Sequence, residues 1–267
     1  MQLTQEQLAR FHKDGFIVLR NFVDMKYCDA ILAVAKVHLE NKIEPIETEI
    51  GYGTRTKEYR TSVTDYSSHT EENAGEEHVI VRRLRQVYER DMLFKEWMED
   101  KKIRPVLEQI LDDDVVLTTA HHNSIMTKMP FYSTDTRWHQ DRRYWRYSDD
   151  NLVSVWLALD NETSENGVLE FIPGSHMMKF SPEQFDKKEY FCESLALNKE
   201  ILSREVSTDL AKGDVVIFHS LLLHRANKNS TNKAKISFVY TVKGLKTKAI
   251  EGSRSASFSE IPLAAIK

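Results

Sequence analysis

The apolar positions of the first forty residues follow a helical period on both sides of one short extended run. Thr4 and Gln7 form a capping-box pattern for a helix that ends near Gly15, and the run FIVLRNF after it is typical of a strand. A second helix is expected to begin at Asp24, whose carboxylate can accept hydrogen bonds from free backbone amides. Its apolar positions recur at helical spacing: Ile31, Val34, Val37 and Leu39.

The chain becomes polar from residue 44 to residue 77. This stretch includes EIGYGTRTKEYRTSVTDYSSHTEENAGEE and has no sustained helical or extended period. A long polar segment of this kind is typical of a surface loop, and such loops often shape substrate pockets. We therefore predict a lid loop over residues 44–77.

A helical period returns over residues 83–111, with a break at Pro105. The apolar positions that carry it are Leu84, Val87, Tyr88, Met92, Val106, Leu107, Ile110 and Leu111. Together with the two earlier helices, this pattern predicts a mainly helical flank over residues 1–111.

Beyond residue 111 the chain consists of short runs rich in β-branched and aromatic residues, separated by turn signals. The runs are DVVLTTAHHNSIM, LVSVWLALD, GVLEFIP, DVVIFHSLLLH and KISFVYTVKG. Strands without intervening helices indicate an antiparallel sandwich or closed barrel. We predict a β core over 112–244, with a polar insertion at 181–208 and a C-terminal tail at 245–267. No repeat or linker divides the chain, so residues 1–267 are expected to form a single domain.

Composition and charge narrow the classes of function. A net charge of −4 gives no basic excess for binding a phosphate backbone, which argues against nucleic acid as the partner. The two cysteines, Cys28 and Cys192, show neither disulfide nor thiolate-metal spacing. The N-terminus is polar, and no stretch approaches the ~18 apolar residues of a membrane span. We expect a globular cytoplasmic protein that does not enter a membrane.

The segment WHQDRRYW, residues 138–145, carries a candidate pair of metal ligands. Successive side chains on a strand alternate between its faces, so His139 and Asp141 would point the same way. An H-x-D pair alone is weak evidence and needs a third ligand, for which DVVIFHSLLLH offers His219 and His224. Two histidines and one carboxylate leave three adjacent positions open on an ion, which favours non-haem Fe(II) over zinc.

Several motifs, in their order and spacing, resemble the phytanoyl-CoA dioxygenase (PhyH) family of Fe(II)/2-oxoglutarate-dependent oxygenases. LTQEQLARFHKDGFIVLRNF is similar to the family's N-terminal helix and strand, WHQD to its metal-binding H-x-D, and VWLALDNETSENGVLEFIPGSH to its next strand pair and turn. KGDVVIFHSLLLHRANKNS resembles the segment with the distal histidine. The resemblance covers most of the chain. It implies a mainly β protein with flanking α: a double-stranded β-helix, the cupin-like jelly roll, with N-terminal helices.

The same resemblance implies the ligands, the cofactors and the reaction. It selects His224 as the distal ligand beside His139 and Asp141, and it places His219 near the end of the preceding strand. The implied cofactors are Fe(II), 2-oxoglutarate as co-substrate, and O2. Related enzymes that transfer chlorine have a small residue where Asp141 stands. Hydroxylation of a small-molecule substrate is therefore the expected reaction.

The sequence departs from the family at the position that binds 2-oxoglutarate. The family has an arginine eleven residues after the distal histidine, whereas this chain has Lys235, which keeps the charge without the bidentate fork. Ala226 also stands where the family often has a hydroxyl residue. Lys235 could bind the co-substrate, Arg225 or another cation could replace it, or binding could be weak or lost. The candidate co-substrate residues are Lys235, Ser237, Trp156 and Lys128.

Arginines and aromatic residues surround the H-x-D pair: Arg137, Trp138, Arg142, Arg143, Tyr144, Trp145, Arg146 and Tyr147. Arginines near a metal can bind a carboxylate or phosphate, and aromatic rings can stack on a substrate, so we expect an anionic small molecule. If the strand continues, Arg143 and Trp145 face the metal, and with Arg137 they are the candidate substrate residues. Alternatively, some arginines only tie strands together by pairing with Asp149, Asp150 or Asp160.

Two other functions are compatible with the sequence. A catalytically reduced, cupin-like binding module would account for Lys235 and Ala226. A zinc hydrolase that uses the same three ligands is disfavoured, because no further carboxylate or histidine is evident as a general base.

Overall fold

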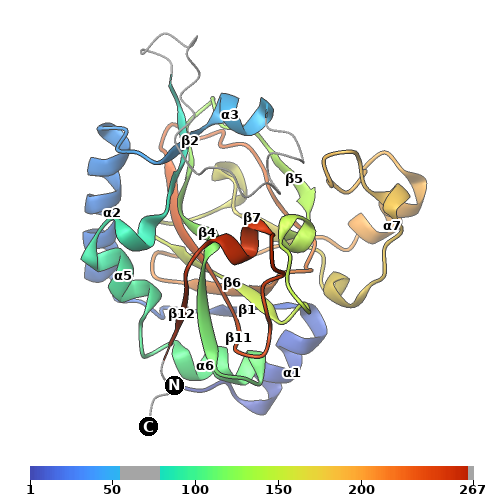
Figure 1. Cartoon of the computed structure of the whole chain (residues 1–267). Coiled ribbons are helices and arrows are strands. Elements are labelled where there is room, and N and C mark those ends of the chain that lie inside the picture. The colour runs from blue at the N-terminus through green and yellow to red at the C-terminus, as the bar shows by residue number, and fades with distance from the viewer. Residues whose placement is uncertain (55–78, 264–267) are drawn as a thin grey trace.

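The computed structural model of the chain describes residues 1–54 and 79–263, in which two antiparallel sheets lie face to face (Figure 1). The larger sheet contains, in spatial order, β1 (Phe16–Leu19), β9 (Val215–His219), β6 (Leu152–Ala158), β11 (Lys235–Gly244), β4 (Val115–Lys128), β3 (Val81–Arg85) and β2 (Ile46–Thr48), with β12 (Glu260–Pro262) also paired to β4. The smaller sheet contains β5 (Thr136–His139), β10 (His224–Ala226), β7 (Leu169–Phe171) and β8 (Val206–Ser207).

Side chains of the larger sheet alternate between two apolar clusters. In β6, Val155 and Leu157 pack toward the helices, whereas Trp156 and Ala158 pack toward the smaller sheet. The strands β9 and β11 alternate in the same way, because successive side chains point to opposite faces of a sheet. The even positions of β6 and the odd positions of β11 therefore face the space between the sheets.

Helices from the first half of the chain cover the outer face of the larger sheet. They are α1 (Gln5–Asp14), α2 (Met25–Glu40), α5 (Met92–Met98) and α6 (Arg104–Leu111), and α2 and α5 lie side by side in Figure 1. The predicted helix caps are confirmed: Thr4 and Gln7 form a capping box, Gly15 ends α1 with a φ of 85°, and Asp24 accepts from amides of α2. Their buried residues share one cluster with the sheet, which fixes the scaffold behind the strands.

Two stretches differ from the predicted pattern. Within the predicted lid loop, residues 46–54 form β2 and α3 (Glu49–Thr54), and the remaining residues 55–77 lie outside the described part of the chain. Residues 83–85, predicted as helical, belong to β3, which pairs with β2 and β4. The cause is burial of polar residues: Glu47, Arg82 and Arg85 are all buried, so the alternation that marks a half-exposed strand is missing.

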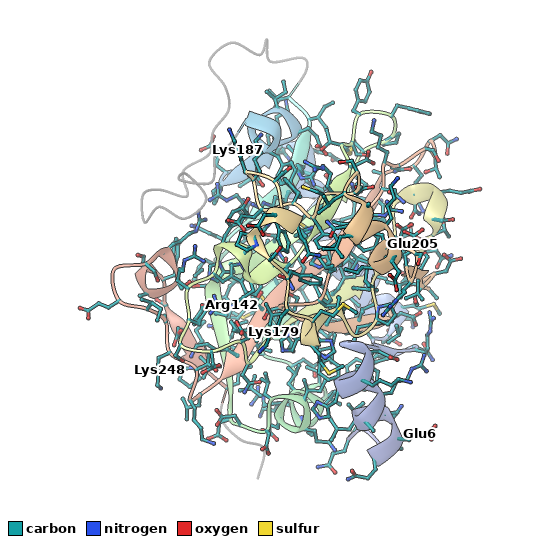
Figure 2. The ribbon with its side chains drawn as sticks, turned by 90° about the vertical axis from the view of Figure 1, so that its right-hand side faces the viewer. Glu6, Arg142, Lys179, Lys187, Glu205 and Lys248 are labelled. Carbon is teal, nitrogen blue, oxygen red and sulfur yellow. The ribbon has the colours of Figure 1, made fainter. Side chains whose placement is uncertain are left out.

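The segment predicted as an insertion adds α7 (Ala196–Leu202) and β8, and its Phe191 packs against Trp138. Figure 2 views this side directly, with Lys187 and Glu205 marking the insertion. The segment predicted as a C-terminal tail contributes β12 to the larger sheet. Within residues 1–54 and 79–263, every helix is too short or too polar to span a bilayer.

Candidate metal centre

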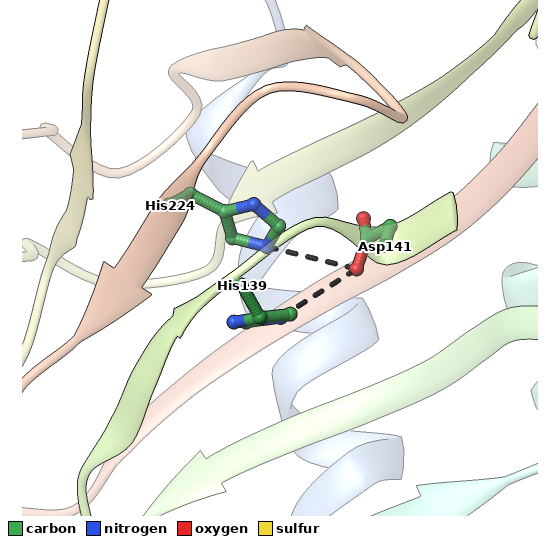
Figure 3. A group of neighbouring side chains, drawn as sticks. All are labelled: His139, Asp141 and His224. Atoms are coloured by element: carbon green, nitrogen blue, oxygen red, sulfur yellow. Dashed lines mark ion pairs between the residues drawn. The ribbon is translucent and has the colours of Figure 1, made fainter. Parts of the chain in front are cut away.

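Three buried side chains meet at one end of the smaller sheet (Figure 3). His139 ends β5 and His224 begins β10, and the antiparallel register places them directly opposite each other. Asp141 begins a short 3-10 helix, Asp141–Tyr144. The predicted strand alternation from residue 139 onward is therefore wrong, because the chain leaves the sheet after His139. The 3-10 turn, and not strand alternation, carries the carboxylate to the histidines.

The ligand atoms of these three residues are within reach of one ion. The Oδ1 atom of Asp141 lies 3.7 Å from Nε2 of His139 and 3.6 Å from Nε2 of His224. The three ligand atoms all lie within 4.8 Å of one another. Two atoms bound to one ion at about 2.1 Å each are separated by at most roughly 4.2 Å, and both distances from Asp141 to the histidines meet that limit. The donor set of two imidazoles and one carboxylate thus fits a divalent transition metal with open positions.

Backbone carbonyls orient both imidazoles for metal binding. Nδ1 of His139 lies 2.7 Å from the carbonyl oxygen of Arg137, and Nδ1 of His224 lies 2.9 Å from that of Leu222. A carbonyl oxygen only accepts, so each Nδ1 carries the proton and each Nε2 presents its lone pair to the site. Burial, followed by the charge of Arg143, lowers the pKa of His139 well below its usual range. The ring is therefore neutral, as a ligand must be.

Asp141 is held by two neighbours, one of which the sequence analysis missed. Ser154 donates a hydrogen bond of 3.0 Å to Oδ2, and Nε2 of His122 lies 3.4 Å from Oδ1. Nδ1 of His122 in turn lies 3.2 Å from the Ser154 hydroxyl. His122 belongs to a bulge in β4, where the register to β11 jumps from Asn123 to Thr118. A bulge breaks the two-residue period, so strand patterning gave no signal for His122.

Two cavities meet beside the triad. One, the lysine chamber, is lined by residues that include Lys128, Trp156, His224, Ala226 and Lys235. The other, the arginine chamber, is lined by residues that include Tyr52, Arg83, Asp141, Arg143, Trp145 and Arg254. His122 and His139 border both cavities. An ion held by the triad would therefore face two separate binding spaces.

The predicted co-substrate residues Lys235, Ser237 and Trp156 lie together around a buried carboxylate that the sequence analysis missed. Oε2 of Glu162 lies 3.0 Å from Nζ of Lys235. Its other oxygen, Oε1, accepts hydrogen bonds of 2.6 Å from Ser237 and 3.0 Å from the indole of Trp156. The side chain of Glu162 has no exposed surface. Lys235 thus has a counter-ion within the protein.

The remaining candidate for the co-substrate, Lys128, has a different environment. Its ammonium group donates to the carbonyl oxygens of Thr134, at 2.6 Å, and Ala226, at 3.0 Å. Burial, together with the charges of Arg82 and Lys235, lowers the pKa of Lys128 to about 6. Lys128 is therefore a buried amine that donates to two carbonyl oxygens and lies near the cations Arg82 and Lys235.

Among the predicted substrate residues, Arg143 and Trp145 line the arginine chamber. The Arg143 guanidinium lies 4.6 Å from the ring centre of Tyr144 and 4.4 Å from that of Tyr190. It also donates a hydrogen bond of 3.4 Å to the carbonyl of Glu189. In the part of the chain that the structure describes, no carboxylate forms an ion pair with Arg143. Trp145 is buried and stacks on His121 with ring centres 4.7 Å apart.

The other arginines near the triad are engaged elsewhere. Arg137 pairs with Asp186 at 2.7 Å and lines neither chamber. Arg142 pairs with Asp150 at 2.7 Å. This pair agrees with the alternative in which some of these arginines only tie parts of the chain together. Arg82, which the sequence analysis missed, borders both chambers and pairs with Glu49 at 2.8 Å.

Comparison with protein families and known proteins gives concordant matches. The family model described as Phytanoyl-CoA dioxygenase (PhyH) matches residues 11–237. A phytanoyl-CoA dioxygenase domain-containing protein 1 homolog from Dictyostelium discoideum is 22% identical over 89% of this chain and 90% of its own length. The peroxisomal phytanoyl-CoA dioxygenase of Homo sapiens is 25% identical over 86% of this chain and 65% of its own length.

Solved structures resemble the fold over almost the whole chain. The epimerase SnoN, crystallised with Fe3+, alpha ketoglutarate and nogalamycin RO, superposes with a TM-score of 0.70 at 18% identity, over 93% of this chain and 86% of its own. EctD from S. alaskensis with bound Fe gives a TM-score of 0.71 at 17% identity, over 98% of this chain and 87% of its own. The likeness confirms the predicted fold class, a cupin-like jelly roll with flanking helices.

Proposed function

The chain belongs to the phytanoyl-CoA dioxygenase family, and from this premise we propose that it is an Fe(II)- and 2-oxoglutarate-dependent dioxygenase that hydroxylates a small anionic substrate. The observation that carries the proposal is the convergence of His139, Asp141 and His224, whose ligand atoms lie within 4.8 Å of one another. A non-catalytic binding module would not need three oriented ligands beside two chambers.

The residues around the triad have defined tasks in this proposal. His139, Asp141 and His224 would occupy one face of the iron, leaving three adjacent positions. When bound, the iron with 2-oxoglutarate and O2 supplies the chemistry that converts a C–H bond to C–OH. The chain holds Asp141 through Ser154 and His122, so that Oδ1 stays directed toward the histidines. The two chambers separate the co-substrate from the substrate and place each next to the metal.

We assign the lysine chamber to 2-oxoglutarate and the arginine chamber to the substrate. The lysine chamber has a mostly apolar wall that includes Leu169 and Phe218, and it carries the buried amine of Lys128, whose charged form is suited to a distal carboxylate. In the arginine chamber, Arg143 would bind an anionic group of the substrate, and Trp145 would form part of the wall beside it. Arg137 pairs with Asp186 and lines neither chamber, so it has no substrate contact in this proposal.

The proposed function is tested by reconstituting the metal-free protein with Fe(II) under anaerobic conditions. We expect one iron per chain, a visible charge-transfer band on adding 2-oxoglutarate, and slow formation of succinate once O2 is admitted. A protein that binds iron but neither binds nor consumes 2-oxoglutarate would contradict the proposal. Metal analysis of natively purified protein, together with hydrolase assays of its zinc form, distinguishes the proposed iron enzyme from a zinc hydrolase.

Replacing Arg143 with methionine is expected to abolish stimulation by anionic substrates while 2-oxoglutarate binding is retained. Loss of a hydrogen bond to a charged group weakens binding by roughly tenfold or more. The measurement is succinate formation above the basal rate with a panel of aromatic and aliphatic carboxylates and phosphates. Arg137→Met is the matched control, since it removes a neighbouring arginine outside the chamber. Equal stimulation in both variants would contradict the role of Arg143.

A further inference from the structure

The lysine chamber contains two lysines that lie directly opposite each other on neighbouring strands. Lys128 of β4 and Lys235 of β11 are cross-strand partners, and each is less than 10% exposed. Like charges at directly opposed positions destabilise a sheet, and buried charges are retained only when compensated. A positive charge on either lysine must therefore be compensated, and the two lysines differ in the partners that they have.

Lys235 is compensated within the protein. Its ammonium donates to Glu162 at 3.0 Å and to the carbonyl oxygen of Gly167 at 2.6 Å. The carboxylate of Glu162 also accepts from Ser237 and Trp156, so both of its oxygens are engaged. A second carboxylate brought to Lys235 would approach the negative charge of Glu162 at close range.

Lys128 lacks such compensation. The carbonyl oxygens of Thr134 and Ala226 take two of its three N–H groups, and within residues 1–54 and 79–263 no carboxylate lies at ion-pair distance from it. The charged groups that face it are Arg82 from β3, Lys235 from β11, Glu49 from α3, and Asp135. Of these, Glu49 is already paired with Arg82 at 2.8 Å. Lys128 is therefore a buried amine whose charged form an incoming anion would stabilise.

We propose that Lys128, and not Lys235, binds the distal carboxylate of 2-oxoglutarate, while Glu162 keeps Lys235 neutralised beside it. This assignment rests on the proposed function, because it presumes that the co-substrate occupies the lysine chamber. Glu162 acts as a positioning residue because it holds Lys235 in an ion pair, as Glu49 holds Arg82, and leaves the amine of Lys128 to pair with the anion.

The assignment implies that co-substrate binding takes up a proton. Burial and neighbouring cations lower the pKa of Lys128 to about 6, so most of its amine is uncharged at pH 7.5. A carboxylate beside it favours the charged form and raises that pKa, so the complex holds a proton that the free protein lacks. Affinity for 2-oxoglutarate should therefore fall as pH rises above about 6, approaching tenfold per pH unit, and level off below that value.

Three comparisons on the anaerobic Fe(II) protein test the assignment. The charge-transfer band measures the affinity for 2-oxoglutarate. Calorimetry in buffers of different ionisation enthalpy measures the proton uptake. Lys128→Met should weaken 2-oxoglutarate binding about 30-fold or more and abolish proton uptake. The double variant Glu162→Gln/Lys235→Met should bind within about threefold of the wild type. 2-Oxopentanoate, which keeps the keto-acid end but has a methyl group for the distal carboxylate, should bind wild type and Lys128→Met equally and take up no proton.

The results distinguish failure of the proposed function from failure of the Lys128 assignment. Wild-type protein that fails to bind 2-oxoglutarate overturns the proposed function together with this assignment. Wild-type binding that Lys128→Met leaves unchanged, or that the double variant abolishes, overturns the Lys128 assignment alone. If Lys128→Met does not fold, proton uptake by the wild type decides the question, because pH-independent binding of 2-oxoglutarate with no uptake contradicts a role for Lys128.

Discussion

Replacing His224 with alanine is expected to abolish iron binding and to lower 2-oxoglutarate turnover by about 100-fold or more. The expectation follows from the geometry, because Nε2 of His224 is one of three ligand atoms within 4.8 Å of one another, and its Nδ1 is fixed by the carbonyl of Leu222. Without this imidazole the site keeps one histidine and one carboxylate, which no longer define a face of an ion. Iron content after reconstitution and the initial rate of succinate formation measure the effect.

His219→Ala is the matched control, since His219 lies in the same DVVIFHSLLLH segment. His219 ends β9, and its Nδ1 accepts a hydrogen bond of 3.1 Å from the amide of Leu221. Its ring lies beside His176, with ring centres 5.2 Å apart, and lines neither chamber. The variant should therefore retain iron and turnover, with only a modest loss of stability. Loss of iron from His219→Ala but not from His224→Ala would reverse the ligand assignment.

The parts of the site that follow from local sequence could be predicted, whereas those that depend on distant contacts could not. WHQD and DVVIFHSLLLH carry their chemistry in a few consecutive residues, so the H-x-D pair and two candidates for the third ligand, His219 and His224, could be named from local sequence. The resemblance to the phytanoyl-CoA dioxygenase family then selected His224. The strands of the core could be predicted for the same reason, from β-branched runs between turns. The reasoning from strand alternation was still wrong beyond His139, because the backbone turns there.

Glu162 and His122 illustrate why the rest was missed. Glu162 stands in DNETSENG, a polar stretch that is typical of an exposed turn, yet it is fully buried by contacts with residues more than 70 positions away, Lys235 and Ser237. His122 reaches Asp141 only because of a bulge in β4. Arg82 is also buried, and for that reason the sequence pattern did not predict strand β3. In each case the position of a polar residue depends on a partner or a backbone irregularity that local sequence patterns do not record.

Lys235→Met is expected to lower the free energy of unfolding by about 3–5 kcal/mol. The side chain of Lys235 is 2% exposed and that of Glu162 is 0% exposed, so the substitution leaves a carboxylate buried without its cation. Ser237 and Trp156 still donate to Glu162, but two neutral donors do not replace an ion pair at a buried position. Urea denaturation of the metal-free protein, which removes any contribution from bound ligands, measures the loss.

The double variant Glu162→Gln/Lys235→Met provides the control for this effect. It removes both charges and keeps an oxygen that can accept from Ser237 and Trp156, so we expect most of the lost stability to return. Additive losses from the two single substitutions would contradict a direct ion pair between Lys235 and Glu162. Recovery in the double variant, by contrast, means that Lys235 and Glu162 form a self-contained unit of the fold. An anion that enters the chamber must then pair with another group, and the amine directly opposite Lys235 on the neighbouring strand β4 is that of Lys128, which becomes charged when the anion binds.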